Sequence, residues 1–245
     1  MTIEYLSGNR ILGLEADTKP TNVSYNSVFL ETDTNNMYNY VTPNNAWVLN
    51  GDAIPHFVSR GVFGGGNDGA NSNVMDYITI ATTGNAIDFG DLTVARSKLA
   101  GVSSDVRGVF GGGNDGANSN VMDYITIATT GNATDFGDLT VARDGIAGGV
   151  SSSTRGVFGG GQTPSGTNTM DYITIATTGN ATDFGDLTVA TGFLAGVSSS
   201  TRGIFGGGFD GSYLNVMGYI TIDTLGNATD FGDLTTSTVG LSGVS

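Results

Sequence analysis

Carboxylates, amides and glycines recur in two short motifs whose residue types could bind a metal ion or a phosphate group or take part in catalysis. Asp-Phe-Gly-Asp begins at Asp88, Asp135, Asp183 and Asp230, and Gly-Gly-Gly-Asn-Asp-Gly occupies 64–69 and 111–116. The first has the letters of the kinase magnesium motif, but the glycine loop, strand lysine and His-Arg-Asp loop of kinases are missing from the sequence. The second lacks the Lys-Ser/Thr and the helix of a phosphate cradle. We therefore interpret Asp-Phe-Gly-Asp as a turn whose Phe packs between structural units and whose Asp caps backbone amides.

Metal binding and catalysis have little support in these motifs. Asp68 and Asp115 could hold a hard cation through carboxylate and carbonyl oxygens, but Asn-Asp-Gly is an ordinary turn sequence. We expect no metal or other cofactor, with calcium at these loops as the alternative. His56 is the only histidine, so a Ser-His-Asp triad would have to be built at one non-repeated place. The sequence also singles out no pair of carboxylates in different environments, as a glycosidase requires.

The elements that position these residues are repeats. Arg-Gly-Val/Ile-Phe-Gly-Gly-Gly begins at Arg60, Arg107, Arg155 and Arg202, a period of 47 or 48 residues, and the 27 residues that start at Arg60 and at Arg107 are identical. The residue pattern of each unit predicts four short strands. The first two are Arg-Gly-Val-Phe and an alternating segment centred on Tyr. The last two are a segment around Phe and Leu, such as Phe136 and Leu139, and a segment of small residues.

Four short strands in about 47 residues are typical of a β-propeller blade. We predict an all-β fold in which 52–245 forms a propeller of four blades, from repeats near 60–106, 107–154, 155–201 and 202–245. The lead-in Ala-Ile-Pro-His-Phe-Val-Ser is three residues shorter than the equivalent segments. We therefore expect the last small-residue segment, before Ser245, to complete the first blade and close the ring without an open edge. An assembly in which chains share a ring is the alternative.

The order of these segments resembles the Kelch repeat: a strand that ends in glycines, a Tyr-centred strand, an aromatic-x-x-Leu strand, then Arg and a small-residue strand. The resemblance implies that the glycines at 64–66, 111–113, 159–161 and 206–208 lie where blades crowd around the axis. The sequence departs from the Kelch pattern by having Phe where the blade Trp is usual and by lacking the Arg in the third and fourth units. The residues concerned are Phe89, Phe136, Phe184 and Phe231, and Arg96 and Arg143.

Residues 1–51 have no copy in the chain. An extended arm from Arg10 that contains Pro20 precedes three predicted strands, at Ser27–Glu31, at Met37–Val41 and around Trp47. Three short strands are marginal alone. We expect this small β-hairpin module to gain a partner surface by oligomerisation, with a trimer favoured.

The segment from about 8 to 50 resembles a module at the start of bacteriophage fibre and tail-associated virion proteins. The residues that carry the resemblance are Asp17-Thr18-Lys19-Pro20, Glu31-Thr32-Asp33-Thr34, Tyr38 and Trp47. The repeats likewise resemble repeats in phage proteins from aquatic environments. The resemblance implies that 1–51 attaches the chain to other virion proteins, through residues that include Asp33, Tyr38, Tyr40 and Trp47.

Composition limits the partners. Lys and Arg number 9 against 23 Asp and Glu, a net charge of −14, and 13% of residues are charged. Such a chain repels phosphate backbones and anionic lipid, so we expect no nucleic-acid partner. We also expect no membrane insertion, because the sequence has no apolar run of about 18 residues. We expect no signal peptide, because the first twelve residues lack a basic start and a long apolar core. The absence of Cys excludes disulfides.

Two loops that vary between units are candidates for binding, because function often changes on loops held by a shared scaffold. One follows the glycines, and the other follows Asp-Leu-Thr. The fourth glycine loop has an aromatic and polar character that suits sugar binding. Neutral drift at turns explains the variation equally well. The candidate contact residues are Asn67, Asp68, Asn114, Asp115, Gln162, Phe209, Asp210 and Tyr213.

These observations together lead us to expect a non-enzymatic structural protein on the surface of a virion. Its propeller would bind a host-surface glycan or protein weakly, with many copies raising the effective concentration. One alternative is a purely architectural protein of the particle. The other is a carbohydrate depolymerase that uses Asp residues in the central pocket.

Overall fold

A computed structural model describes 60–146 and 148–244 with their side chains, and the backbone of five short strands nearer the N-terminus. The chain divides into two compact units, Met1–Val58 and Ser59–Ser245. Each unit is described by itself. No helix occurs among the described residues, and so none could span a membrane.

The N-terminal unit contains a five-stranded sheet in the order β1-β2-β3-β4-β5. The hairpin predicted at Met37–Val41 and around Trp47 is present, with Tyr40 opposite Trp47 in the register. The expected extended arm is wrong in part, because Arg10–Gly13 is a strand that pairs in parallel with Val28–Glu31. The strands are β1 (Glu4–Tyr5), β2 (Arg10–Gly13), β3 (Val28–Glu31), β4 (Met37–Val41) and β5 (Ala46–Leu49).

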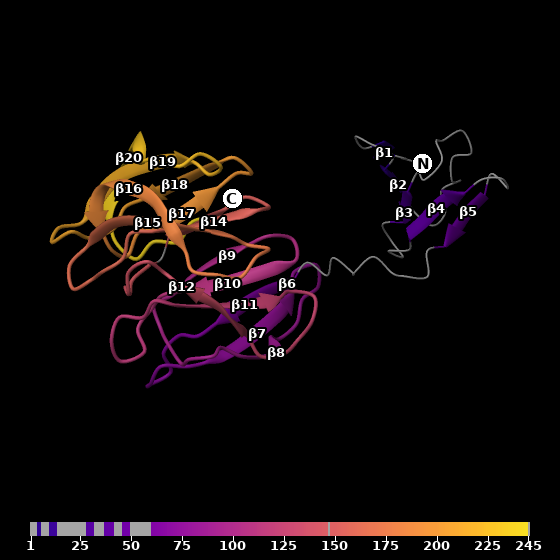
Figure 1. Cartoon of the computed structure of the whole chain (residues 1–245), viewed down its shortest axis with the longest axis horizontal. Helices are drawn as coiled ribbons and strands as arrows, with labels where there is room; N and C mark the ends of the chain where they lie inside the picture. Colours follow the sequence, from indigo (N-terminus) through magenta and orange to yellow (C-terminus); the bar gives the residue numbers. More distant parts are fainter. Residues whose placement is uncertain are drawn as a thin grey trace. The chain divides into compact units, whose positions relative to one another are not determined.

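The second unit is a four-bladed β-propeller made of four antiparallel sheets, as the repeats predict (Figure 1). The first blade contains β6 (Arg60–Gly64), β7 (Val74–Thr79) and β8 (Ile87–Asp91). The second contains β9 (Ala100–Ser103), β10 (Arg107–Gly111), β11 (Val121–Thr126) and β12 (Thr134–Asp138). The third contains β13 (Gly148–Ser151), β14 (Arg155–Gly159), β15 (Thr167–Thr174) and β16 (Thr182–Thr191). The fourth contains β17 (Ala195–Ser198), β18 (Arg202–Gly206), β19 (Leu214–Thr221) and β20 (Thr229–Thr238).

Each repeat gives its last strand to the following blade. β9, β13 and β17 pair with β10, β14 and β18, so the first blade has three strands among the described residues. The segment Leu241–Val244 continues the series, since Gly243 packs so closely on β17 that an added Cβ would collide with Val197 Cγ1. No pairing of this segment with β6 occurs among the described residues, in contrast to the expected closure of the ring.

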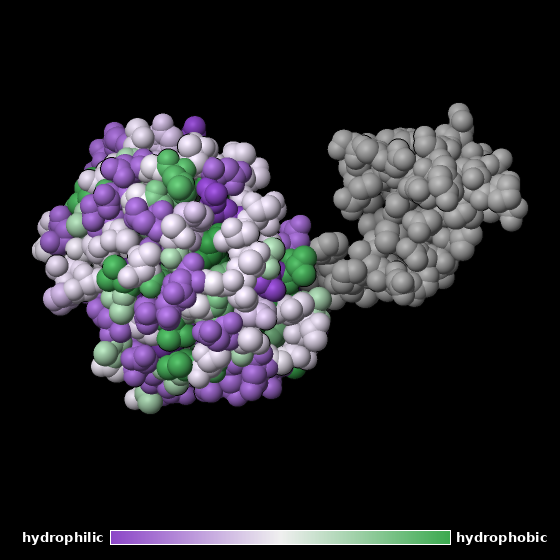
Figure 2. Space-filling view, in the orientation of Figure 1, coloured by the Kyte–Doolittle hydropathy of each residue, from purple (hydrophilic) through white to green (hydrophobic). Residues whose placement is uncertain are grey.

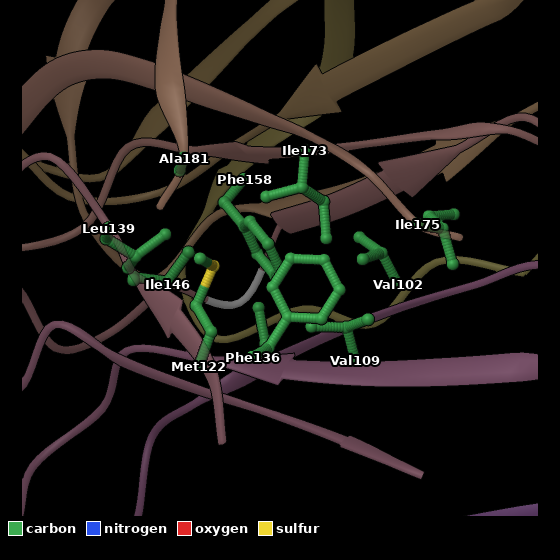
Figure 3. Close-up of a cluster of buried hydrophobic side chains, with 11 residues drawn as sticks. Val102, Val109, Met122, Phe136, Leu139, Ile146, Phe158, Ile173, Ile175 and Ala181 are labelled. Atoms are coloured by element: carbon green, nitrogen blue, oxygen red, sulfur yellow. The ribbon is translucent and has the colours of Figure 1, made fainter. Parts of the chain in front are cut away.

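Hydrophobic side chains from neighbouring blades form the core, because one face of each sheet packs on the next (Figure 3). Phe136 of the second blade and Phe158 of the third lie in one cluster and are 2% and 0% exposed. Phe136 also packs against Tyr124 of its own blade at 6.1 Å between ring centroids, edge to face. Burial of one such side chain stabilises the fold by about 1.5–3 kcal/mol.

The Asp-Phe-Gly-Asp segments lie in an edge strand of each blade, the third strand that each repeat forms, rather than in turns, which corrects our interpretation. The expected packing of Phe between blades is confirmed for Phe89, which lies in one cluster with Ile125 and Ala133 of the second blade. The expected capping by Asp occurs at Asp230, whose Oδ1 accepts a hydrogen bond of 3.3 Å from Gly232 N.

The three consecutive glycines have different structural roles. In the first three repeats the first glycine lies against the Phe of the next blade, and a Cβ on Gly159 would be 2.7 Å from Phe205 Cε1. The second and third adopt positive φ in every repeat, +67° and +106° at Gly112 and Gly113. Residues with a Cβ rarely adopt this conformation. The glycines therefore permit both close blade packing and the turn that starts the variable loop.

Two buried ion pairs join neighbouring blades. Arg96 Nη2 lies 2.8 Å from Asp123 Oδ2, and both side chains are fully buried. Thr93 Oγ1 donates to the other oxygen of Asp123. Burial lowers the pKa of Arg96, and the attraction to Asp123 opposes this effect. The pair Arg143–Asp171 repeats the arrangement between the second and third blades, whereas Gly218 stands at the Asp position of the fourth blade.

Candidate functional site

The two groups of variable loops meet between successive repeats. Backbone bridges join Ser97 to Asn114 and Asp144 to Gln162, and a third joins Gly192 to Phe209. The loop after the third strand of one repeat therefore lies beside the glycine loop of the next. Both sets of loops form one surface, which we call the loop face.

The centre of the loop face is a position with left-handed backbone in every repeat. Lys98, Gly145, Phe193 and Gly240 are equivalent, with φ of +57°, +62°, +57° and +65°. Phe193 N donates to Gly145 O at 2.8 Å, and Gly240 N donates to Phe193 O at 3.0 Å. A left-handed backbone costs a residue with a side chain about 1–2 kcal/mol. Strain of this kind concentrates at functional sites, so Lys98 and Phe193 are the first residues to consider.

Lys98 and Phe193 lie beside a carboxylate that the second repeat contributes. Lys98 Nζ is 3.1 Å from Asp144 Oδ2 and 5.7 Å from the centroid of the Phe193 ring. Asn114 Nδ2 donates to the same oxygen of Asp144 at 3.2 Å. The Lys98 side chain is 50% exposed and that of Asp144 is 9% exposed. An anchored carboxylate thus lies under an ammonium group that is open to solvent.

The fourth glycine loop adds two aromatic rings. The ring centroids of Phe209 and Tyr213 lie 5.8 Å apart, and Tyr213 is 61% exposed. Hydrogen bonds from Ser212 N at 3.1 Å and Ser212 Oγ at 2.9 Å hold Asp210 Oδ1. These bonds lower the pKa of the Asp210 carboxyl, because they favour its charged form. The loop therefore presents an ionised carboxylate next to an exposed ring.

The other predicted contact residues hold their own turns. Asn67 Oδ1 and Asp68 Oδ1 accept hydrogen bonds from Gly69 N at 3.1 Å and Ala70 N at 3.4 Å. Asn114 and Asp115 do the same in the second repeat. Gln162 exchanges two backbone hydrogen bonds with Asp144. Across the described residues, groups of three or more His, Cys, Asp or Glu side chains that could hold a metal do not occur.

The predicted attachment residues belong to the N-terminal unit. Tyr38 and Tyr40 lie on β4 and Trp47 on β5, where Tyr40 pairs with Trp47 in the register. Asp33 and His56 lie outside the described residues.

Sequence reasoning identified both variable loops but not the residues at their centre, Lys98, Asp144 and Phe193. A signal for them exists in the sequence. The four equivalent positions read Lys, Gly, Phe and Gly, and Gly at two of them indicates a backbone that disfavours side chains.

Comparison with known proteins adds no identity: no protein-family description and no curated protein matches the chain. On the face in Figure 2, hydrophilic and neutral residues predominate and hydrophobic residues form separate patches.

Proposed function

We propose that this chain is a non-enzymatic structural protein of a bacteriophage particle and that its loop face binds a carbohydrate of the host surface. The observation that carries the proposal is the cluster of Lys98, Asp144 and Phe193, from three successive repeats on one scaffold. An aromatic ring offers an apolar platform to a sugar, and the ammonium, carboxylate and amide groups offer directed hydrogen bonds.

The virion assignment draws on resemblance. The propeller is consistent with the Kelch-like order of the segments, and residues 8–50 resemble the module that begins many phage fibre and tail-associated proteins. In this proposal the N-terminal unit attaches the chain to other virion proteins and forms a trimer. Weak binding by each loop face then adds up through the effective concentration of many copies.

Binding is favoured over hydrolysis because of how Asp144 is held. Its Oδ2 accepts hydrogen bonds from Lys98 and Asn114, which anchor the carboxylate within the loop face. A depolymerase needs one carboxyl group that donates a proton and a second at a fixed separation. Asp144 is suited instead to orient Lys98 and to accept hydroxyl hydrogen bonds from a sugar.

The test is binding of the full chain to purified bacterial surface polysaccharides, measured by calorimetry. We expect weak binding to at least one polysaccharide, and at least a tenfold loss in Phe193→Ala. Leu225→Ala is the matched control, because Leu225 is an exposed apolar residue, 53% exposed, in a turn at the other end of β19. Release of reducing sugar would support the depolymerase instead. Normal adsorption but fragile particles after deletion of the gene would support an architectural role.

A further inference from the structure

The contacts between neighbouring blades follow one pattern, and the first element of the pattern is a ring in a glycine notch. Phe158 packs on Gly111 and Phe205 packs on Gly159, with added Cβ atoms at 2.9 and 2.7 Å from the rings. Phe158 and Phe205 are accordingly 0% and 2% exposed. The equivalent ring of the first blade, Phe63, is 63% exposed. The equivalent glycine of the fourth blade is Gly206, and a Cβ added there would have only Met217 of the same blade within 4 Å.

The second element is an arginine that reaches into the next blade. Arg107 Nη1 donates to Ile175 O and Arg155 Nη1 donates to Ile222 O, both at 3.0 Å. Arg202 is the equivalent donor of the fourth blade and has no such carbonyl partner among the described residues. Ile80 carries the equivalent carbonyl of the first blade, and its side chain is 61% exposed.

The third element is a Gly-Asn turn that covers the Phe-Gly-Asp strand of the preceding blade. Asp186 N donates to Asn227 Oδ1 at 3.0 Å, and Gly226 N donates to Phe184 O at 2.9 Å. Phe184 is 2% exposed under this turn, whereas Phe231 of the fourth blade is 45% exposed. The chain thus carries two halves of one further interface. We call them the leading face (Phe63, Ile80 and the turn Gly84–Asn85) and the trailing face (Arg202, Gly206, Phe231–Asp233 and Gly243–Val244).

A groove beside β6 forms the inner part of the leading face. Its volume is about 300 Å³, and its walls include Val62 of β6 with Gly101 and Gly108 of the second blade. In the next interface the equivalent glycines, Gly149 and Gly156, are covered by Val102 of the inner strand β9. The groove therefore lies where the inner strand of the first blade would add its valine. Among the residues that the structure describes, β6 pairs only with β7, so its other edge offers unpaired backbone groups to such a strand.

The segment with the matching sequence is Leu241–Val244. Gly243 lies on Gly196 and Val197 as Gly196 lies on Gly149 and Val150, so this segment holds the position of an inner strand on the fourth blade. Val244 is 94% exposed, against 5% for Val102 and 1% for Val150. The segment is thus positioned by its own blade and has an uncovered valine.

We propose that the trailing face of one copy docks on the leading face of a second copy. Gly243 and Val244 then add to β6 as the inner strand, Phe63 enters the notch at Gly206, and Arg202 donates to the carbonyl of Ile80. A second copy is the occupant because the described residues of one chain leave both faces uncovered, with the first and fourth blades at opposite ends of the series (Figure 1). Association of this head-to-tail kind closes into rings or extends into filaments. It holds whether or not the protein belongs to a virion.

Disulfide trapping tests the proposal, since the full chain has no Cys of its own. Within the second and third blades, the inner strand places Val102 opposite Val109 and Val150 opposite Val157, so Val244 is expected opposite Val62. We would mix a Val62→Cys chain with a Val244→Cys chain of different tag length and oxidise mildly. The expected product is a mixed dimer of intermediate mass. A Leu225→Cys chain replaces Val244→Cys in the control, because the turn at Leu225 packs toward the third blade.

Two surface changes give an independent readout, the mass of the full chain in solution by light scattering. Gly206→Val fills the notch; φ at Gly206 is not positive, and the flexible side chain of Met217, 3.2 Å from an added Cβ, has to shift by a few tenths of an ångström. Phe63→Ser removes the exposed ring. Both changes are expected to reduce the mass by at least half at a given concentration, while Tyr213→Ser, at a ring of similar exposure, leaves it unchanged.

Two outcomes would overturn the proposal. One is a Val62→Cys/Val244→Cys double variant that forms its disulfide within a single chain, since the ring would then close on itself. The other is the lack of a mixed dimer in the trapping experiment together with an unchanged mass for Gly206→Val and Phe63→Ser.

Discussion

Arg143 Nη1 lies 2.6 Å from Asp171 Oδ2, and both side chains are completely buried between the second and third blades. The same arginine also donates to the carbonyl of Phe158 at 3.2 Å. Two charges are thus removed from water together, and each is compensated only while the other is present. The interface between the third and fourth blades shows the alternative solution, with Thr191 at the Arg position and Gly218 at the Asp position.

Replacing one partner of this pair is expected to be far more harmful than replacing both. Arg143→Thr or Asp171→Gly alone leaves a buried unpaired charge and should lower the free energy of unfolding by about 3–5 kcal/mol. The double variant copies Thr191 and Gly218 and should lose less than either single variant. Urea unfolding of the four proteins measures this coupling. Equal and additive losses would show that the pair does not act as a unit.

Lys98 is expected to lower the free energy of unfolding, because its backbone is left-handed, while its side chain contributes to polysaccharide binding. Lys98→Gly relieves the left-handed backbone and should raise the free energy of unfolding by up to about 1 kcal/mol. Lys98→Ala keeps the strain and loses the contact with Asp144, so it should be slightly less stable than the natural chain. Polysaccharide binding should weaken in both variants. A Lys98→Gly chain less stable than Lys98→Ala would contradict the strain argument.

The stability lost when the Phe of the Asp-Phe-Gly-Asp strand is replaced by Ala should increase with the burial of its ring. Phe136→Ala removes a ring that is 2% exposed and should cost about 3–5 kcal/mol. Phe231→Ala removes the equivalent ring at 45% exposure, so the loss should be less than half as large. Thermal and urea unfolding at low protein concentration compares the two. Equal losses would mean that Phe231 is covered in solution, as in the head-to-tail assembly.

The Asp210 carboxyl should titrate below its ordinary pKa of 3.8. Hydrogen bonds from Ser212 favour the charged form, so the order they give to the loop is fully present above that value. It is lost as the pH falls through the lower pKa of the folded protein. Carbon NMR of Asp210 measures the midpoint, and Ser212→Ala should move it only partly toward 3.8, because the backbone donor remains. A midpoint at or above 3.8 would argue against these bonds in solution.

Local pattern was sufficient to predict the blades. The alternation around Tyr124 and the glycines that end Arg107–Gly111 are properties of single strands, so β10 and β11 could be predicted from either copy of the repeat. The hairpin at Met37–Val41 was visible for the same reason.

Features that depend on contacts between segments were missed. The parallel pairing of Arg10–Gly13 with Val28–Glu31 follows from a crossover that no local pattern encodes. The partner of Arg96 is Asp123, 27 residues away in the next repeat. A comparison of repeats could have found it, because Arg and Asp are lost together at Thr191 and Gly218. The loop face was predicted as two separate loops, since only the stacking of blades brings Lys98 to Asp144.

The contacts between blades always run in the same direction along the chain, and this affects which changes in the number of repeats the gene can accept. Each of the first two repeats carries an arginine of the buried pairs, Arg96 or Arg143, and an aspartate at the position of its partner, Asp76 or Asp123. The 27 residues from Arg60 recur unaltered from Arg107. Unequal crossing-over between such segments inserts or removes one complete blade with its partners intact. Between the third and fourth repeats, where Thr191 faces Gly218, an inserted unit would bring an unmatched charge. Gain and loss of blades should therefore be tolerated near the start of the array and selected against near its end.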